Sequence, residues 1–453
     1  MASKSFSVIF HEKINTFNKT VHIDSDKSIS QRSFIIGSIC EGTSTVKNIL
    51  ESHDIYSTIN CLRKLNCKIK RIRKGEYKIF GKGLGSYYCN KNTVLNFGNS
   101  GTAARLLGFG VCSTNPNLQI KITGDKSLRN RSMYKIIKAM ENFGVTFLPK
   151  NKFKLPITLI SSPSPIGFKF KNDFSSQIKS AIILGAINSF GKTEVTERIK
   201  SRDHTEKMLK HNTKVIKIKK GKENLIEING KEVLNPFNLF VPGDPSSASF
   251  FAALCLINKK SRVILKQVHI NPTRIGFFNL IKKHNGKIFF RNKKVVGNEL
   301  TADIHIKSSR LKPIKVDEKL FVSCQDEFPL MFAMASLLPG KSVFKGIGDL
   351  ANKESNRIKE MGKILKQIGI KFSASKDKMI INGNPNLSSY RKKITVTGIY
   401  DHRILMSAAI ISLITGIKSK LSNFEQVSTS CPNFLYTIKK LGGRFEKKKL
   451  KLR

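Results

Sequence analysis

A polar turn followed by an apolar run, at residues 24–32, brings side chains that could bind an anion to the start of a predicted helix. Asp26 can cap the helix by accepting the free N–H groups of its first turn. Ser28 and Arg32 are four residues apart and share one helix face, and Lys27 lies at the helix mouth. Together with the helix dipole, these groups favour a phosphate or carboxylate ligand. Taken alone, the stretch favours an ordinary surface helix start, because such residues are common in a chain this basic.

The same pattern, a polar or small-residue turn opening into an apolar helix, occurs six times. Such a regular period indicates repeated structural units, and six units of about 75 residues account for the whole chain. Because a helix that is apolar on most faces is buried, each unit is predicted to contain one core helix. The helices open near Lys27, Asn99, Ser175, Asp244, Asp326 and Asp401, at intervals of 69 to 82 residues.

Short alternating runs between these helices predict strands, and amphipathic segments predict outer helices. The fold class is therefore α/β, with six βα-type units divided between two domains and a hinge near residues 241–243. We expect a first domain at 21–241 and a second made of 1–20 with 242–453. Strands are expected at 45–50, 118–122, 263–266 and 393–396, and outer helices at 56–65, 133–143, 277–284 and 358–368.

Composition places the chain among globular proteins. Its 453 residues, 40% of them hydrophobic, can fill more than one core. The longest apolar run, 404–417, is shorter than the roughly 20 residues that span a bilayer, so it predicts a buried helix. We see no secretory signal at the start of the sequence. The eight cysteines show no metal-binding spacing and are typical of reduced, mostly buried thiols in a cytoplasmic protein.

The net charge of +50, from 81 Lys and Arg against 31 Asp and Glu, has two readings. A basic chain can bind nucleic acid. Abundant Lys, Asn, Ile and Phe with no Trp is also typical of codon bias in an AT-rich genome. The lysines are scattered and form no long tail or aromatic-interleaved patch, which favours codon bias.

Further cations occur at or near the other helix openings. Two carboxylates, Asp326 and Glu354, stand among them in the sequence and could act as base and acid. A phosphomonoester carries about −2 charge near neutral pH, so two phosphorylated substrates would need several cations. The further cations are Arg105, Arg129, Arg131, Arg202, Lys353, Arg357 and Arg403.

Nine motifs in order resemble the EPSP synthase family, over nearly the whole chain. The sequence of the motif at residues 201–206, Ser-Arg-Asp-His-Thr-Glu, resembles that of the bacterial subgroup called class II. The motifs are Lys27-Ser28-Ile29-Ser30-x-Arg32, Gly98-Asn99-Ser100-Gly101-Thr102, Gly124-Asp125-x-Ser127-Leu128-x-x-Arg131, Ser175-Ser176-Gln177-x-Lys179-Ser180, Ser201-Arg202-Asp203-His204-Thr205-Glu206, Asn271-Pro272-Thr273-Arg274, Asp326-Glu327-x-Pro329, Lys353-Glu354-Ser355-x-Arg357 and Asp401-His402-Arg403.

The resemblance implies a fold of two domains, each with three βαβαββ units about a pseudo-threefold axis, closing over the substrates. It implies transfer of the enolpyruvyl group of phosphoenolpyruvate (PEP) to the 5-hydroxyl of shikimate 3-phosphate, in the shikimate pathway. No cofactor and no metal are implied. The implied partners are these two small molecules, without nucleic acid or membrane, and the protein is expected to be a cytoplasmic monomer.

Site roles follow from the resemblance, position by position. Asp326 would take the hydroxyl proton, Glu354 would handle protonation of the PEP methylene, and Lys27 would lie between the substrates. Shikimate 3-phosphate would be bound by Lys27, Ser28, Arg32, Ser175, Ser176, Gln177, Ser201, Arg202, Asp326 and Lys353. PEP would be bound by Lys27, Gly101, Arg131, Gln177, Arg357 and Arg403.

The chain departs from the family pattern at several positions. Asp24-Ser25 replace a Pro-Gly pair, Gln31 replaces a His and Asn356 replaces an Asp, so charge changes near the predicted site. Asp326 and Asp401 also fit plain helix caps, and His204 and His402 fit structural hydrogen-bonding roles.

Two other functions remain open at this point. A fold relative transfers enolpyruvyl to UDP-N-acetylglucosamine and needs a reactive loop cysteine, for which Cys112 is the candidate, although no activating cation stands beside it. A basic RNA-binding or RNA-end-processing protein on a related fold would show salt-dependent binding to RNA.

Overall fold

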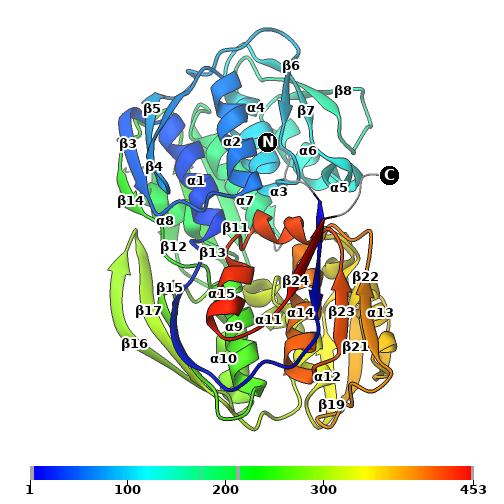
Figure 1. The fold of residues 1–453 in the computed structure, drawn as a ribbon. Coiled ribbons are helices and arrows are strands. Elements are labelled where there is room, and N and C mark those ends of the chain that lie inside the picture. Colours follow the sequence, from blue (N-terminus) through cyan, green and yellow to red (C-terminus); the bar gives the residue numbers. More distant parts are fainter. Residues whose placement is uncertain (1–4, 174, 211–214, 450–453) are drawn as a thin grey trace. The chain divides into compact units, whose positions relative to one another are not determined.

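The protein is described by a computed structural model that covers residues 5–173, 175–210 and 215–449 (Figure 1). Its contacts divide the chain into two compact units. Unit 1 comprises Met1–Asp24, Gly243–Val295 and Leu300–Arg453, and unit 2 comprises Ser25–Pro242 and Val296–Glu299. The chain passes between the units at 24/25 and 242/243, where the sequence predicted 20/21 and 241/242. The excursion of residues 296–299 into unit 2 was not foreseen.

Each unit contains three four-stranded sheets of one design. In every sheet an edge strand runs parallel to its neighbour, and that neighbour pairs antiparallel with the third strand. Parallel strands need a crossover connection, and in four of the six sheets the segment between the two parallel strands contains one core helix.

In unit 2 the sheets contain, in spatial order, β14 (Asn238–Phe240), β3 (Glu41–Lys47), β5 (Glu76–Lys82) and β4 (Lys68–Arg73); β6 (Thr93–Asn96), β7 (Gln119–Thr123), β9 (Ile157–Ile160) and β8 (Thr146–Leu148); and β10 (Lys169–Asn172), β11 (Lys192–Glu197), β13 (Asn224–Asn229) and β12 (Ile216–Lys219). In unit 1 they contain β22 (Lys393–Val396), β23 (Lys418–Leu421), β1 (Phe6–Phe10) and β24 (Glu446–Lys449); β16 (Lys287–Val296), β17 (Glu299–Lys307), β15 (Arg262–His269) and β2 (Asn18–His22); and β18 (Lys315–Val316), β19 (Gly340–Lys345), β21 (Lys378–Gly383) and β20 (Lys371–Ala374).

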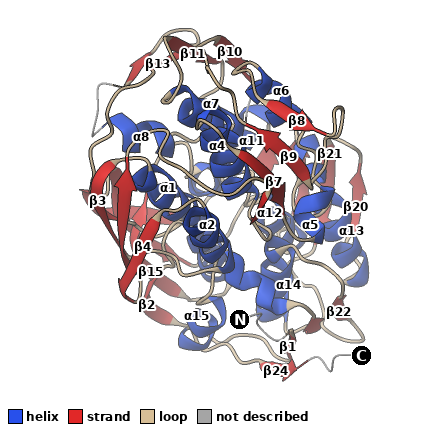
Figure 2. Cartoon of the chain, turned by 90° about the horizontal axis from the view of Figure 1, so that it is seen from above, coloured by secondary structure: helices blue, strands red, loops and turns tan. Residues whose placement is uncertain are grey.

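The six predicted core helices are present and almost wholly buried. Figure 2 shows two of the unit 2 segments, α4 (Cys112–Thr114) and α7 (Ser176–Ala186), side by side. The core helices are α1 (Lys27–Ser38), α3 (Gly101–Ala103) with its continuation, and α7 (Ser176–Ala186) in unit 2, and α9 (Pro245–Ile257), α12 (Phe328–Ser336) and α14 (His402–Thr415) in unit 1.

Helix α14 contains all but the last two residues of the apolar run at 404–417 and has buried residues on every face. Within the described ranges, no helix has both the length and the apolar character needed to cross a bilayer.

Polar side chains cap these helices as the turn residues predict. Asp26 accepts a hydrogen bond from the Ile29 amide at 2.7 Å, and Asp401 accepts one from the Arg403 amide at 2.9 Å. Helix α12 is the exception, because its cap position is Glu327, whose side chain makes no capping bond. Asp326 stands one residue earlier, so the plain-cap interpretation of Asp326 is wrong.

The second core helix differs from the continuous α-helix that its pattern suggests. After α3 the chain forms a π-helix, η1 (Ala104–Val111), and then the short α4 (Cys112–Thr114). A Cβ on Gly108 would lie 2.9 Å from the Phe97 ring, and one on Gly110 would lie 3.0 Å from the Ala181 carbonyl oxygen. These close approaches depend on the packing partners and leave no trace in a hydrophobic period.

The outer helices and strands lie where the alternating patterns predict them, with small shifts at their ends. Strand β3 begins earlier than expected and ends at Lys47, because Asn48 has a φ of 56° that interrupts the extended chain. The predicted outer helices are α2 (His53–Lys64), α6 (Tyr134–Glu141), α10 (Gly276–Lys283) and α13 (Arg357–Gln367); the remaining helices are α5 (Lys126–Asn130), α8 (His204–Lys210), α11 (Glu318–Cys324), α15 (Phe434–Lys440) and the short 3-10 segments η2 (Gly348–Asn352) and η3 (Phe424–Thr429).

Candidate functional site

Arg32 on α1 is the centre of a buried hydrogen-bond network in unit 2. Its guanidinium donates to Ser28 through Nη1, to Thr205 Oγ1 at 2.8 Å and to Ser180 Oγ at 3.0 Å. Thr205 also donates to Ser180, at 2.8 Å. Arg32 is only 1% exposed, so its orientation is set by residues of α1, α7 and α8. The predicted pairing of Ser28 with Arg32 on one helix face is confirmed.

Lys27, at the first position of α1, has a carboxylate partner that the sequence did not reveal. Its Nζ lies 3.1 Å from Asp54 Oδ2, and about a fifth of the lysine side chain remains exposed. Asp54 is 27 residues away on α2 and is itself buried. The pair holds the ammonium group at the start of α1 while leaving it accessible.

Gly101, at the start of α3, is surrounded by cationic and amide groups. A Cβ on Gly101 would lie 2.8 Å from Arg105 Nη1 and 2.9 Å from Arg131 Nη1. Arg105 Nη1 also donates to Gln177 Oε1 at 2.8 Å, and Gln177 Nε2 donates to Thr102 Oγ1 at 3.0 Å. The structure therefore brings three of the residues predicted to bind PEP together.

The other residues predicted to bind shikimate 3-phosphate in unit 2 lie on α7 and on the loop before α8. Ser175 caps α7 by accepting from the Ile178 amide at 3.3 Å, and Ser176 follows it. Ser201 is fully buried and donates to Glu197 Oε1 at 2.6 Å, whereas Arg202 beside it is partly exposed.

In unit 1, Arg357 joins the two predicted catalytic carboxylates to a third. Its Nη2 lies 2.7 Å from Glu354 Oε2, its Nε lies 3.0 Å from Asp401 Oδ2, and its Nη1 lies 3.6 Å from Asp326 Oδ1. Burial works to lower the pKa of Arg357, but the charges of Asp401, Glu354 and Asp326 outweigh it and raise that pKa. Asp326 and Glu354 each keep over a fifth of their side chain exposed.

Asp401 is the residue that sequence reasoning undervalued. It caps α14, as predicted, and it also binds Arg357 and accepts from Ser355 Oγ at 3.0 Å. The signal was its place beside Arg403 in the last motif.

Lys353 and Arg403 complete the predicted set in unit 1. Lys353 Nζ donates to Gln325 Oε1 at 2.7 Å and lies 2.5 Å from Asp349 Oδ2. Arg403 is 4% exposed, donates to the Ser246 carbonyl at 3.3 Å and lies over the Phe250 ring at 5.7 Å. Burial and the charge of Asp326 raise the pKa of the neighbouring Glu327, against the opposing charge of Arg403.

Three arginines predicted to bind PEP each have a buried nitrogen atom without a hydrogen-bond acceptor among the described residues. Arg131 Nε, Arg357 Nη1 and Arg403 Nε are each buried and make no hydrogen bond to any described residue. A buried donor without an acceptor is costly, and a phosphate or carboxylate ligand would supply the acceptor.

Two of the residues that depart from the family pattern, Asn356 and Asp24, make hydrogen bonds in the structure. Asn356 caps α13 by accepting from the Lys359 amide at 3.1 Å, a task that an uncharged oxygen performs as well. Asp24 accepts from the backbone and the side chain of Asn433, at 3.0 and 2.6 Å, within unit 1. Burial raises the pKa of Asp24, against these hydrogen bonds.

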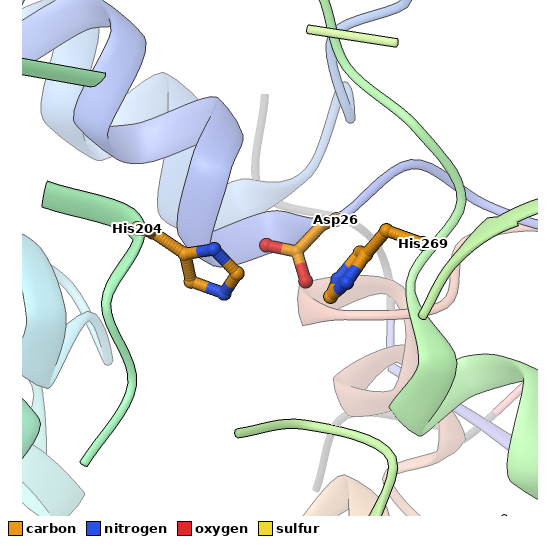
Figure 3. Close-up of side chains that lie close together, drawn as sticks. All are labelled: Asp26, His204 and His269. Atoms are coloured by element: carbon orange, nitrogen blue, oxygen red, sulfur yellow. The ribbon is translucent and has the colours of Figure 1, made fainter. Parts of the chain in front are cut away.

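One cluster in unit 2 has the composition of a metal site. Ligand atoms of Asp203, His204 and Glu299 lie within 4.8 Å of one another. However, Lys207 lies 2.5 Å from Glu299, and Lys200 lies 2.8 Å from Asp203. These lysines neutralise both carboxylates, which explains the cluster as an ion-pair network. Figure 3 shows the His204 ring beside the Asp26 carboxylate of the same unit; His269, also drawn, belongs to unit 1.

Cys112 lacks the properties of a reactive loop cysteine. It lies in α4 with no exposed surface, and burial holds its pKa well above the ordinary value of a thiol. This environment disfavours the UDP-N-acetylglucosamine alternative. All eight cysteines are free, and all but the partly exposed Cys89 are buried, as predicted.

We expect iodoacetamide at neutral pH to leave Cys112 unmodified in the folded protein and to modify it after unfolding in urea, because alkylation requires an accessible thiolate. Peptide mass spectrometry after timed exposure measures this, and Cys89 is the internal control that should react first. Equal rates for Cys112 and Cys89 in the folded protein would contradict the assignment.

Comparison with solved structures defines the fold. The crystal structure of the enolpyruvyl transferase NikO from Streptomyces tendae matches with a TM-score of 0.74, covering 99% of this chain and 100% of that one at 12% identity, a likeness of fold alone. The architecture is the two-domain enolpyruvyl-transferase fold predicted from the sequence.

Closer comparisons define the family. The family model for EPSP synthase (3-phosphoshikimate 1-carboxyvinyltransferase) matches residues 11–438, and the chain belongs to this family. It is 35% identical over 430 residues to the 3-phosphoshikimate 1-carboxyvinyltransferase of Zymomonas mobilis (94% of each chain) and 38% identical over 427 residues to that of Petrotoga mobilis (94% of this chain, 97% of the relative). The EPSP synthase structure from Acinetobacter baumannii matches with a TM-score of 0.83 at 33% identity, covering 98% of this chain and 100% of that one.

Proposed function

We propose that this chain is a 3-phosphoshikimate 1-carboxyvinyltransferase, which transfers the enolpyruvyl group of PEP to the 5-hydroxyl of shikimate 3-phosphate and releases phosphate. This is the shikimate-pathway step on the route to chorismate and the aromatic amino acids. Membership of the family supports the proposal. The observation that carries it is the set of buried arginine donors at Arg131, Arg357 and Arg403, which anionic substrates would satisfy.

Shikimate 3-phosphate would be recognised by hydroxyl and cationic groups of the α1, α7 and α8 starts. Arg32 would supply charge for the 3-phosphate, while Ser28 and Thr205 fix its guanidinium. The proposed ligands of this substrate are Lys27, Ser28, Arg32, Ser175, Ser176, Gln177, Ser201, Arg202, Asp326 and Lys353.

PEP would be recognised by guanidinium groups, which suit its phosphate and carboxylate oxygens because they donate in pairs. The proposed ligands are Lys27, Gly101, Arg131, Gln177, Arg357 and Arg403. Domain 21–241 would form the shikimate 3-phosphate side, and the domain of 1–20 with 242–453 would form the PEP side, supplying the two carboxylates with Arg357 and Arg403.

The chemistry needs one base and one acid. Asp326 would accept the proton of the 5-hydroxyl as the hydroxyl oxygen attacks the central carbon of PEP. Glu354 would deliver a proton to the PEP methylene. The tetrahedral adduct then loses phosphate and a methyl proton, which restores the double bond. Arg357, in contact with both carboxylates, would hold them in place and offset their charge.

The direct test is phosphate release from PEP in the presence of shikimate 3-phosphate. We expect release that depends on both substrates, followed with a coupled phosphate assay. Folded protein that releases no phosphate under these conditions would overturn the proposal.

We expect Gly101→Ala to raise the KM for PEP by about tenfold, because the added Cβ would displace Arg131 and Arg105. The KM for shikimate 3-phosphate should change little. Steady-state titration of each substrate measures both values.

The matched control is Gly221→Ala, at an exposed turn where the nearest atom to the new Cβ lies 3.4 Å away. It should leave both KM values unchanged. An unchanged KM for PEP in Gly101→Ala would remove Gly101 from the proposed PEP site.

The subgroup, the oligomeric state, the location in the cell and the absence of macromolecular partners stay predictions. We propose a cytoplasmic monomer of the class II subgroup that acts on these small molecules without a nucleic-acid or membrane partner. Sedimentation and salt-dependent RNA binding would test the monomer and the absence of nucleic acid.

A further inference from the structure

Unit 2 contains a fully buried lysine that the proposed reaction does not use. Lys179 on α7 has no exposed side-chain surface, and its Nζ lies 2.6 Å from Glu206 Oε1 and 3.0 Å from Glu197 Oε2. Burial works to lower the pKa of Lys179, but the charges of Glu206 and Glu197 raise it above its ordinary value. Lys179 therefore stays charged inside the protein, a state that lysine rarely adopts unless it is paired.

The two carboxylates flank the loop that carries Ser201 and Arg202. Glu197 is the last residue of β11, and Glu206 lies in the first turn of α8. A single ammonium group thus joins both ends of the loop at residues 198–203. Buried ion pairs of this kind depend on good geometry, so the distance between β11 and α8 is closely defined.

Glu197 and Lys179 also bind a residue inside the loop at 198–203, Ser201. Glu197 Oε1 accepts from Ser201 Oγ at 2.6 Å and from the Ser201 amide at 3.3 Å. Lys179 Nζ donates to the Ser201 carbonyl at 3.5 Å. The side chain and both backbone polar groups of Ser201 are therefore bound by Glu197 and Lys179.

The residues that follow in sequence extend the contact to Arg32. Ser180, next to Lys179, and Thr205, next to Glu206, hydrogen-bond to each other and accept from the Arg32 guanidinium. The same two helix starts thus carry the ion pair and the partners of Arg32. A change in the ion pair would move the hydroxyls that orient this guanidinium.

We propose that Lys179, Glu197 and Glu206 are positioning residues that hold Ser201, Arg202 and Arg32 in the arrangement needed for the phosphate of shikimate 3-phosphate. This inference rests on the proposed function. Preorganised cations and hydroxyls bind a phosphate without an ordering cost at the moment of binding. A purely structural cluster would instead affect both substrates alike or only the stability of the fold.

The test compares two glutamates of the same strand. Glu197→Gln keeps the side-chain volume but cannot serve Lys179 and Ser201 with two oxygens. Glu194→Gln is the matched control, because Glu194 lies on β11 and pairs at the surface with Lys169 and Lys192. The readouts are the KM for each substrate, kcat, and the Kd of shikimate 3-phosphate alone by calorimetry.

We expect Glu197→Gln to raise the KM and Kd for shikimate 3-phosphate by about tenfold, with the KM for PEP changed less than about twofold and the control like wild type. Glu206→Gln keeps an oxygen that can accept from Lys179, so it should also raise the KM for shikimate 3-phosphate, but by less. If Glu197→Gln does not fold, Glu206→Gln provides the test. Equal rises in both KM values, or none, would overturn the positioning role. Wild-type protein without turnover would instead refute the proposed function.

Discussion

Asp326→Asn and Glu354→Gln should each lower kcat by about 100-fold or more, the scale of general acid–base catalysis, while substrate binding persists. Each substitution keeps the shape of the side chain and removes its ability to take up or deliver the proton. Both carboxylates contact Arg357, yet each keeps over a fifth of its surface exposed, so the proposed proton transfers have access. Steady-state kinetics with calorimetric titration of shikimate 3-phosphate measures both effects.

The control for these variants is Glu360→Gln. Glu360 lies in the first turn of α13, close in sequence to Glu354, and pairs with Lys363 at 2.8 Å. Its kcat should match wild type. If Asp326→Asn and Glu354→Gln also turned over at the wild-type rate, neither carboxylate would have the assigned role.

Arg357→Met should destabilise the protein by about 3–5 kcal/mol, because it leaves the fully buried Asp401 without its cation. At an unfolding entropy of about 2.1 cal/mol/K per residue, that loss corresponds to a fall in melting temperature of about 3–5 °C for a chain of 453 residues. Thermal unfolding followed by circular dichroism measures it. Activity should be lost as well, since the proposed PEP ligand and the partner of both catalytic carboxylates are removed.

Two further variants separate the stability effect from the binding effect. Arg357→Lys keeps the charge and should retain most of the stability, but it loses the paired donors and should still raise the KM for PEP. Arg444→Met breaks an exposed contact with Glu12 and should leave the melting temperature nearly unchanged. Equal melting temperatures for Arg357→Met and Arg444→Met would show that the buried pairs do not support the fold.

Much of the fold could be predicted because its signals are local. Cap residues such as Asp26 and Asp401 accept hydrogen bonds from amides within three residues of their own position. The apolar composition of a helix predicts that the helix is buried. The repeat then fixes the number of units. The π-helix at Ala104–Val111 could not be predicted, because its apolar residues show the same pattern as those of an ordinary buried α-helix.

The candidate site could be predicted only in part, for the same reason. The cations follow helix starts and are visible in the sequence, but their partners are contributed by other segments. Asp54 lies 27 residues from Lys27, and Asp401 lies 44 residues from Arg357. Pairings over such separations are set by the arrangement of elements, which no local pattern reveals.

The most direct measurement is ³¹P nuclear magnetic resonance of the purified protein mixed with PEP and shikimate 3-phosphate. We predict that the PEP signal falls as inorganic phosphate appears in equal amount, while the 3-phosphate signal shifts to that of the enolpyruvyl ether and mass spectrometry finds that product. Each substrate alone should stay unchanged. Folded protein that leaves the mixture unchanged, or that releases phosphate without forming the ether, would contradict the account.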